Sequence, residues 1–415
     1  MKRLKLETQA SVAAAIEHIK SHQAAGHSHI ECPIECSVNS LEYLMRIQDQ
    51  AIVYWSPRQD QTGIAAWGLA EIIQGPFALS RAQSCARERS VRLFGCLAFD
   101  KSQTDNHLFW LPEWMLIQSD LSQTLHWNRP NKSIPNYQPE LSTAKELQLP
   151  SKKRWISSIS ALEPDFNSGE LTKVVFAQQN ILNRPANLGP IESLSLLKKI
   201  HDHTFDFCFA PHTDYAFIGR SPERLIQLNA DTIRTEALAG TRPRGKTPEE
   251  DQQLEHELFH SKKERMEHQI VVDAICKGLA PYVDKIEKRD VPSILKLSQV
   301  QHLHTPIEAI IKKGVKLSDI IDALHPTPAV CGTPRSTAMR IIQNTEDFQR
   351  GWYAGLVGWV EADKAEFAVG IRSALYTKGQ ICFWAGAGIV AQSDPLSEWQ
   401  EIETKSKQFL DLVNQ

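Results

Sequence analysis

Two pairs of glutamates in this sequence have a spacing that could support metal chemistry. Glu264 and Glu267 lie three residues apart, and so do Glu398 and Glu401. Residues three apart are neighbours on the surface of a helix, so each pair would present two carboxylates on one side. Carboxylate oxygens are the ligands that hard divalent cations prefer. The alternative for each pair is an ordinary charged helix surface exposed to water.

The second pair follows a stretch that contains two glycines. The segment Cys382–Lys405 predicts a strand that ends at Trp384, then a turn at Gly386 and Gly388, then a helix. The Ser-Asp-Pro sequence before Leu396 can cap that helix and occupy its first turn. Because glycines let a backbone approach a ligand closely, a notch here, beside two carboxylates, could hold a cation together with an anionic small molecule.

The first pair also needs a helix to position it, and the sequence predicts a long one over Pro248–Leu279. At about 100° per residue, Glu264 and Glu267 fall on the same side as Val271 and Ile275. Burying an unpaired carboxylate costs several kcal/mol, so this face would need a cation, hydrogen bonds or protonation. If the buried stripe begins only further along the helix, both glutamates are solvated instead.

Short strands dominate the rest of the C-terminal half. Lys173–Leu182 has the alternating pattern of a strand. A three-stranded antiparallel meander is expected from Gly351–Glu361, Glu366–Tyr376 and Gln380–Trp384. Arg372 would lie inside the second of these strands, among apolar residues, where an arginine needs an anionic partner.

The first 150 residues carry no recognisable chemistry and are expected to be mostly antiparallel sheet. Ser119–Pro150 is rich in polar residues and proline, which predicts a long connection to a second region that covers residues 151–415. In that region the basic, glycine-containing stretch Ala239–Lys246 is expected to be a loop.

Composition excludes several classes of protein. The 415 residues carry a net charge of −3, with 42% hydrophobic and 23% charged residues, so no basic nucleic-acid surface is expected. No apolar run approaches the ~20 residues that a membrane helix needs, and the N-terminus lacks the apolar core of a secretory signal. The eight cysteines are scattered without a zinc-binding pattern. These features predict a cytoplasmic protein with thiols kept reduced.

Seven motifs between Ser151 and Val413 occur in the same order as in the chorismate-utilising enzymes, and this segment resembles that family. The family includes isochorismate synthases, salicylate synthases and the chorismate-binding subunits of anthranilate and aminodeoxychorismate synthases. The motifs are GRSPERL (219–225), EALAGTRPRG (236–245), SKKERMEHQIVVDAI (261–275), HPTPAVCGTPR (325–335), RGWYAGLVG (350–358), FAVGIRSALY (367–376) and GAGIVAQSDPLSEWQEIETK (386–405).

This resemblance implies an α+β fold, in which large interleaved antiparallel sheets are flanked by helices around one central active site. The N-terminal 150 residues would be a mostly β part of the same fold. The resemblance also implies a metal-binding role for the two glutamate pairs, which would face each other across a Mg²⁺ ion. Glu267 and Glu401 would be its nearest ligands, and Glu264 and Glu398 would act through water.

The resemblance further implies a role for individual side chains. Members that add water to chorismate carry a lysine at the start of the KVV strand, which is Lys173 here. Glu223 would be the complementary general acid. The remaining residues that match family positions around the substrate are Ala239, Gly240, Thr241, Ala329, Tyr353, Arg372, Gly386, Gly388 and Lys405.

Together these features favour an isochorismate synthase that converts chorismate to isochorismate as a monomer, without a glutaminase subunit. A salicylate synthase, which goes on to eliminate pyruvate, is the main alternative, because no residue separates the two. Lys173 argues against an ammonia-adding enzyme, whose members tend to have glutamine there. Retention of every acid, base and metal carboxylate argues against a non-catalytic chorismate-binding protein. Menaquinone and siderophore biosynthesis are both open as pathways.

Overall fold

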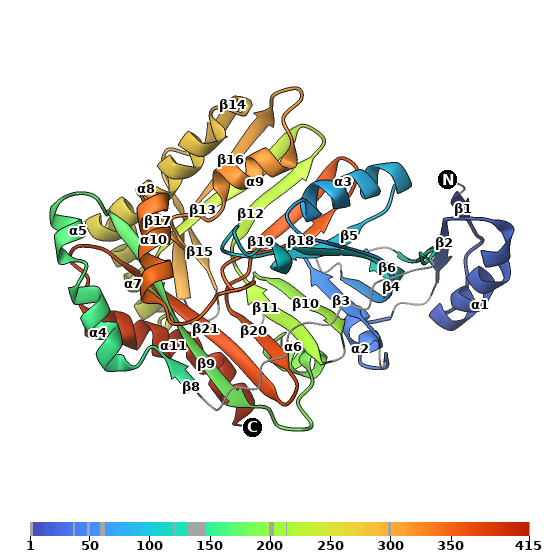
Figure 1. The fold of residues 1–415 in the computed structure, drawn as a ribbon, viewed down its shortest axis with the longest axis horizontal. Coiled ribbons are helices and arrows are strands. Elements are labelled where there is room, and N and C mark those ends of the chain that lie inside the picture. The colour runs from blue at the N-terminus through green and yellow to red at the C-terminus, as the bar shows by residue number, and fades with distance from the viewer. Residues whose placement is uncertain are drawn as a thin grey trace.

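The computed structural model of the chain describes residues 3–35, 38–47, 50–58, 63–119, 122–131, 147–198, 203–212, 214–297 and 300–414 (Figure 1). Its α-helices are α1 (Val12–His22), α2 (Ser40–Leu44), α3 (Ala78–Arg89), α4 (Lys152–Ser160), α5 (Glu163–Asn167), α6 (Pro190–Lys198), α7 (Pro248–His260), α8 (Lys262–Leu279), α9 (Leu317–Leu324), α10 (Arg335–Thr345) and α11 (Pro395–Val413). Two short 3₁₀ turns are η1 (Gln23–Ala25) and η2 (Thr104–Asn106).

The strands in the first half of the chain are β1 (Arg3–Lys5), β2 (His29–Ile34), β3 (Ile52–Ser56), β4 (Ile64–Gln74), β5 (Leu93–Leu97), β6 (Leu108–Gln118), β7 (Gln123–Asn128), β8 (Leu147–Leu149) and β9 (Lys173–Asn183). Those in the second half are β10 (Phe205–His212), β11 (Tyr215–Ser221), β12 (Arg224–Asn229), β13 (Thr232–Pro243), β14 (Val283–Lys288), β15 (Ser293–Lys296), β16 (Val300–Ile311), β17 (Gly332–Thr333), β18 (Leu356–Val360), β19 (Lys364–Val369), β20 (Ser373–Thr377) and β21 (Gln380–Ile389).

Two runs of antiparallel strands meet at β6. One run has the order β6–β4–β3–β10–β11–β20–β21–β9, and the other has the order β6–β5–β18–β19–β12–β13–β16. Each run mixes strands from both halves of the chain, because β3 pairs with β10 and β5 pairs with β18. This mixture of helices and interleaved antiparallel sheet confirms the predicted α+β class.

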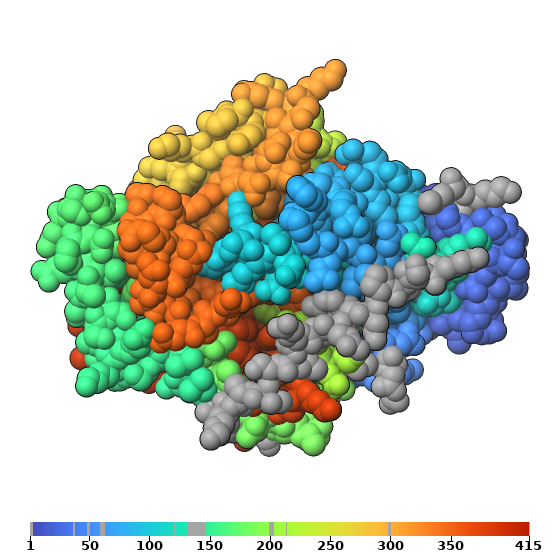
Figure 2. Space-filling model, viewed as in Figure 1, coloured from blue at the N-terminus to red at the C-terminus, as the bar shows by residue number. Residues whose placement is uncertain are grey.

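Side chains also join the two halves of the sequence. Figure 2 shows teal residues of the first half directly against orange residues of the second. The indole Nε1 of Trp352 donates to the Asn106 carbonyl at 2.6 Å, and Gln343 Nε2 donates to Asp100 Oδ2 at 2.7 Å. Large aromatic residues fill the core between strands of both halves, among them Trp55, Phe94, Phe207 and Phe217. The N-terminal residues thus support the sheet on which later strands are built.

The strand predicted at Lys173–Leu182 is confirmed as β9. Its Val-Val-Phe sequence suits a strand buried on both faces, and residues 173–178 are all buried. β9 pairs with β21 over ten residues. Helix α11 packs on β21, and α8 packs on β13, so helices pack on both runs of the sheet (Figure 1).

The turn expected at the two glycines is wrong, because β21 runs straight through Gly386 and Gly388 to Ile389. The predicted break assumed that glycine interrupts a strand, but the long ladder with β9 holds this backbone extended. The helix after it begins as predicted. Asp394 caps α11 by accepting from the Ser397 amide, and Pro395 lies in the first turn.

The single helix expected over Pro248–Leu279 is two helices, α7 and α8. They divide at Ser261, whose backbone is extended and whose hydroxyl caps α8 by accepting from the Glu264 amide. A serine three residues before a glutamate is a signal for a helix start. The predicted sharing of one helix by Glu264 and Glu267 is unaffected, because both lie in α8.

Three other expectations need correction. The meander forms only in part: β18 pairs with β19 and β20 pairs with β21, but the expected middle strand is two strands, of which β19 also pairs with β12 and β20 with β11. Within Ala239–Lys246 the chain stays in β13 as far as Pro243, with a bulge at Gly240, whose φ is +78°. The connection at Ser119–Pro150 contains β7 and β8, and residues 120, 121 and 132–146 of that range lie outside the described residues.

Two expectations drawn from composition can also be compared with the structure. Among the described residues, no helix is both long and apolar enough to cross a membrane. The seven described cysteines are free thiols, and Cys36 lies outside the described residues.

Candidate active site

A cleft of about 950 Å³, including its open mouth, lies between the two runs of strands and beside α8 and α11. It is lined by every residue predicted for catalysis and substrate binding: Lys173, Glu223, Ala239, Gly240, Thr241, Ala329, Tyr353, Arg372, Gly386, Gly388 and Lys405. Of the four predicted metal ligands, Glu267 and Glu401 line it, whereas Glu264 and Glu398 do not. Residues separated by more than two hundred positions are thus brought to one site.

Lys173 lies at the start of β9 with its side chain only 2% exposed. A surface lysine at a strand edge is therefore excluded. Its Nζ donates to Glu267 Oε1 at 2.6 Å, which joins β9 to α8. Burial raises the pKa of Glu267, but the charge and hydrogen bond of Lys173 outweigh burial and hold that pKa below its ordinary value. The carboxylate of Glu267 is therefore ionised and available to a cation.

Glu223 lies between β11 and β12, where the Ser221 hydroxyl accepts from its amide. Burial, reinforced by the negative charge of Glu236, raises the pKa of Glu223 to about 8. The surface salt bridge with Arg224 that sequence alone allowed does not form, because Arg224 Nη2 contacts Glu366 Oε1 at 3.4 Å. A carboxyl group that stays protonated near neutral pH is suited to act as a general acid.

A buried ion pair behind Glu223 was missed by sequence reasoning. Arg58 Nη1 donates to the carbonyl of Pro222 at 2.7 Å, and the Arg58 guanidinium binds both carboxylate oxygens of Glu236 at 2.5 and 2.7 Å. His304 Nε2 contacts Glu236 Oε2 at 3.0 Å. Burial raises the pKa of Glu236, but His304 and Arg58 reverse this effect and lower it to about 2. The fixed charge of Glu236 is one reason why Glu223 keeps its proton.

Arg372 lies between β19 and β20, not inside a strand as predicted. Its φ of +49° is in the left-handed region, which bulky residues rarely adopt, and this backbone turns the chain from β19 to β20 at the edge of the cleft. Tyr353 lines the same cleft and its ring stacks on that of Trp384, with 5.4 Å between the ring centroids. Trp384 also lines the cleft and was predicted only as the end of a strand.

The two glycines of β21 direct backbone groups into the cleft. Val175 and Ala177 of β9 face Gly388 and Gly386, and both donate their amides to acceptors away from β21. In an antiparallel ladder, facing residues direct their backbone groups alike, so both glycines direct theirs away from β9. The carbonyl of Gly386 accordingly accepts from Lys405 Nζ at 2.9 Å. The glycine amides on this side are suited to bind an anion.

Carboxylates beside the cleft offer donors for a divalent cation. Glu267 and Glu401 offer hard oxygen ligands at the cleft, and each is contacted by a lysine, Lys405 Nζ lying 2.7 Å from Glu401 Oε1. Burial raises the pKa of Glu398, and the charge of Glu401 raises it further, although Ser393 acts in the opposite direction. A cation would relieve this crowding of negative charge, and carboxylate oxygens are the donors that Mg²⁺ accepts.

Glu264 is engaged elsewhere. Its Oε1 accepts from Arg242 Nη1 at 2.8 Å, and its Oε2 accepts from the Thr241 amide at 3.2 Å. A direct bond from Glu264 to a cation would have to compete with these contacts. Its contribution through water stays a prediction, as does that of Glu398.

A matched pair of substitutions separates the two sides of the cleft. A Cβ added at Gly388 would lie 2.8 Å from Lys173 Cε, whereas one at Gly386 would lie 3.0 Å from the Tyr353 hydroxyl. Displacing a catalytic group by about 1 Å costs about 10²-fold in rate. We expect Gly388→Ala to lower kcat by about 10–100-fold, and Gly386→Ala chiefly to raise KM. Steady-state kinetics of both variants measures these changes. The prediction would be contradicted if the two variants changed kcat and KM to the same extent.

Comparisons with known proteins agree with this architecture. Residues 124–414 match the family described as chorismate binding enzyme. The chain is 33% identical over 407 residues to an isochorismate synthase of Pasteurella multocida, with 93% of each chain covered. It is 37% identical over 283 residues to a salicylate biosynthesis isochorismate synthase of Pseudomonas aeruginosa, covering 68% of this chain and 58% of that one.

A solved structure gives the same result. The menaquinone-specific isochorismate synthase from Escherichia coli superimposes with a TM-score of 0.87 and 28% identity, covering 97% of this chain and 99% of that one. The cleft, with its buried acid and lysine on interleaved sheets, defines the protein as an enzyme. The chain belongs to the chorismate binding enzyme family, as the resemblance of its motifs predicted.

Proposed function

We propose that this protein is an isochorismate synthase, which converts chorismate to isochorismate by adding water at C2 and removing the hydroxyl at C4. The observation that carries the proposal is that a buried lysine and a buried, protonated glutamate line one cleft. A relative with this activity in its name, aligned along 93% of both chains, supports it. Lys173 favours addition of water without a glutaminase subunit, and we propose that the protein acts as a monomer in the cytoplasm.

In the proposed mechanism, Lys173 and Glu223 divide the proton transfers. Lys173 removes a proton from a water molecule as its oxygen bonds to C2. The ring double bonds shift, and Glu223 gives its proton to the C4 hydroxyl, which leaves as water. Arg372 and Tyr353 hold the enolpyruvyl carboxylate, together with the backbone amides of the β21 glycines. No covalent intermediate is needed, so positioning and charge neutralisation provide most of the rate enhancement.

We further propose that Mg²⁺ is the cofactor, held by Glu267 and Glu401 directly and by Glu264 and Glu398 through water. The cation would supply positive charge that neutralises these carboxylates and the ring carboxylate of the substrate. Glu267 would then no longer be the ion-pair partner of Lys173.

Product analysis tests the proposed function. Purified protein is incubated with chorismate, with Mg²⁺ or with EDTA, and the products are separated by reversed-phase chromatography. We expect isochorismate to approach an equilibrium mixture with chorismate when Mg²⁺ is present, and EDTA to abolish turnover, with recovery when excess Mg²⁺ is added back. Undiminished turnover in EDTA would exclude the cofactor, and unchanged chorismate with folded, Mg²⁺-loaded protein would exclude the activity.

The same experiment separates the neighbouring activities. Salicylate together with pyruvate would identify a salicylate synthase, and formation of an aminated product with ammonia would identify an ammonia-adding enzyme. The names of the relatives divide between menaquinone and salicylate biosynthesis. Isochorismate as the sole product would fit either pathway.

A further inference from the structure

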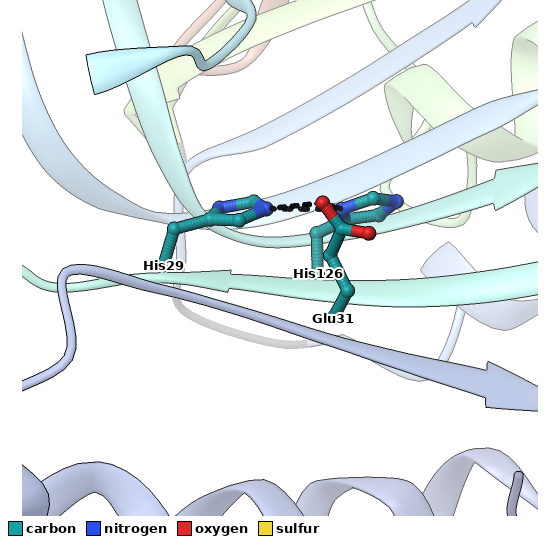
Figure 3. Close-up of side chains that lie close together, drawn as sticks. All are labelled: His29, Glu31 and His126. Atoms are coloured by element: carbon teal, nitrogen blue, oxygen red, sulfur yellow. Dashed lines mark hydrogen bonds and ion pairs between the residues drawn. The ribbon is translucent and has the colours of Figure 1, made fainter. Parts of the chain in front are cut away.

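Two histidines and a glutamate converge on one face of the N-terminal sheet, away from the cleft. His29 and Glu31 are two residues apart on β2, so they point to the same side. In the antiparallel pairing with β7, Glu31 faces His126 and His29 faces Asn128. Figure 3 shows the two rings and the carboxylate directed toward a common point between the strands. None of these residues lines the cleft.

The distances among the three side chains match those of a metal site. His29 Nε2 lies 3.1 Å from Glu31 Oε1 and 3.4 Å from His126 Nδ1, and His126 Nδ1 lies 4.0 Å from Glu31 Oε1. A tetrahedral zinc ion with bonds of about 2.0–2.2 Å requires its ligand atoms to be about 3.3–3.6 Å apart. The average of the three observed separations is of this size, so a zinc ion fits with only small movements.

Hydrogen bonds around His29 show which of its nitrogens faces the other two side chains and could bind a metal. Asn128 Nδ2 donates to the carbonyl of Pro112 at 2.8 Å, which can only accept, so the amide orientation of Asn128 is fixed. Asn128 Oδ1 therefore faces His29 Nδ1, at 2.8 Å, and His29 Nδ1 must carry the proton. His29 Nε2 is then the nitrogen that faces Glu31 Oε1, at 3.1 Å, and it is the one placed to bind a metal.

His29 Nε2, His126 Nδ1 and Glu31 Oε1 thus face one another, and each can give an electron pair to a metal ion placed between them. Buried His29, held through its other nitrogen by fully buried Asn128, has the second contact that orients most metal-binding histidines. The nearest cation is Arg3, whose Nη2 donates to Glu31 Oε1 at 2.7 Å from an exposed position. Arg3 contacts only the carboxylate, so the two ring nitrogens stay directed toward the site between the strands.

We propose that His29, Glu31 and His126 form a binding site for Zn²⁺. Two nitrogens and one oxygen are a donor set that zinc accepts, in contrast to the all-oxygen set proposed for Mg²⁺ at the cleft. Three protein ligands leave one position for a water molecule. The ion links β2 to β7 and so stabilises the N-terminal edge of the sheet. This site is independent of the function proposed for the cleft.

Zinc titration of the full-length protein tests the site. Protein stripped with a chelator is titrated with Zn²⁺ by calorimetry in excess Mg²⁺, which competes for the all-oxygen carboxylates at the cleft. Bound metal is counted by mass spectrometry after dialysis. We expect about one equivalent of zinc per chain. Zinc should also raise the melting temperature, because it binds only the folded protein.

Three variants locate the bound ion. Glu31→Gln and His126→Gln each remove one ligand and should weaken zinc binding by at least about tenfold, with product formation from chorismate unchanged. His260→Gln is the matched control, because His256 and His260 on α7 form an exposed pair with ring centroids 4.0 Å apart. Failure of the wild type to bind zinc, or loss of binding in His260→Gln but not in Glu31→Gln, would overturn the proposal.

Discussion

Replacing Lys173 with glutamine is expected to lower kcat by about 10²–10⁴-fold, the usual contribution of a general base. Glutamine can still donate a hydrogen bond to Glu267, which Lys173 contacts at 2.6 Å. The buried site would therefore keep a polar partner for that carboxylate, while no side chain remains that can accept a proton from water. Steady-state kinetics with chorismate measures the loss.

Two controls make this result specific to the base. Lys262, at the start of α8, is exposed, and Lys262→Gln removes the same charge without contacting the cleft. It should keep the wild-type kcat. Equilibrium dialysis with chorismate and Mg²⁺ should show that Lys173→Gln still binds the substrate. A Lys173→Gln protein that retained more than about a tenth of the wild-type kcat would show that another group is the base.

The second large effect is expected from Glu223→Gln. Glutamine has the shape of the protonated glutamate but cannot give up a proton, so kcat should fall by about 10²–10⁴-fold. In the wild type, the pKa of about 8 predicts that the rate declines as pH rises above about 8, because the acid is lost by ionisation. Any residual rate in the variant should lack this decline. An unchanged alkaline limb in Glu223→Gln would assign the ionisation to a different group.

The same variant is also expected to change how the stability of the fold depends on pH. The pKa of Glu223 is raised from the ordinary value of 4.5 to about 8 in the folded protein. As pH rises from about 4.5 to about 8, the unfolded chain loses this proton and the folded chain keeps it, so the wild type loses stability over that range. Glu223→Gln lacks this loss. Urea unfolding at about pH 5 and about pH 9 measures this. Between these two values, the unfolding free energy of the variant should rise by a few kcal/mol relative to that of the wild type.

Secondary-structure elements that have a local sequence pattern could be predicted from the sequence. The strand at β9 followed from its β-branched and aromatic residues, and the start of α11 followed from its Ser-Asp-Pro cap. The placement of Lys173 and Glu223 in one cleft came from the family resemblance, because no local pattern brings together residues fifty positions apart. Their burial then gave those positions chemical meaning, as a lysine on an exposed strand edge would have had none.

Where sequence reasoning failed, pairing between distant segments was the cause. The glycines of β21 stay extended because β9 pairs with them along ten residues, and Arg372 leaves its apolar run because β19 and β20 belong to different strand pairs. The contact between Arg58 and Glu236 joins residues 178 positions apart and has no local signal.

The zinc site left a weak signal that was overlooked. His29 and Glu31 alternate along one strand, as do His126 and Asn128, and such spacing places each pair on one face. The signal was missed because His126 lies in the stretch Ser119–Pro150, which was expected to be a connection. Recognising β7 within it would have brought the two pairs together.

The central claim, that a water molecule supplies the new hydroxyl, can be tested most directly with isotopic oxygen. Chorismate is converted in water enriched with ¹⁸O, and the isochorismate is analysed early by mass spectrometry with fragmentation that reports the C2 oxygen. The proposed mechanism predicts that ¹⁸O enters at C2 in the same proportion as in the solvent. Isochorismate whose C2 hydroxyl carries no label would show that the hydroxyl is transferred within the substrate and would contradict the role given to Lys173.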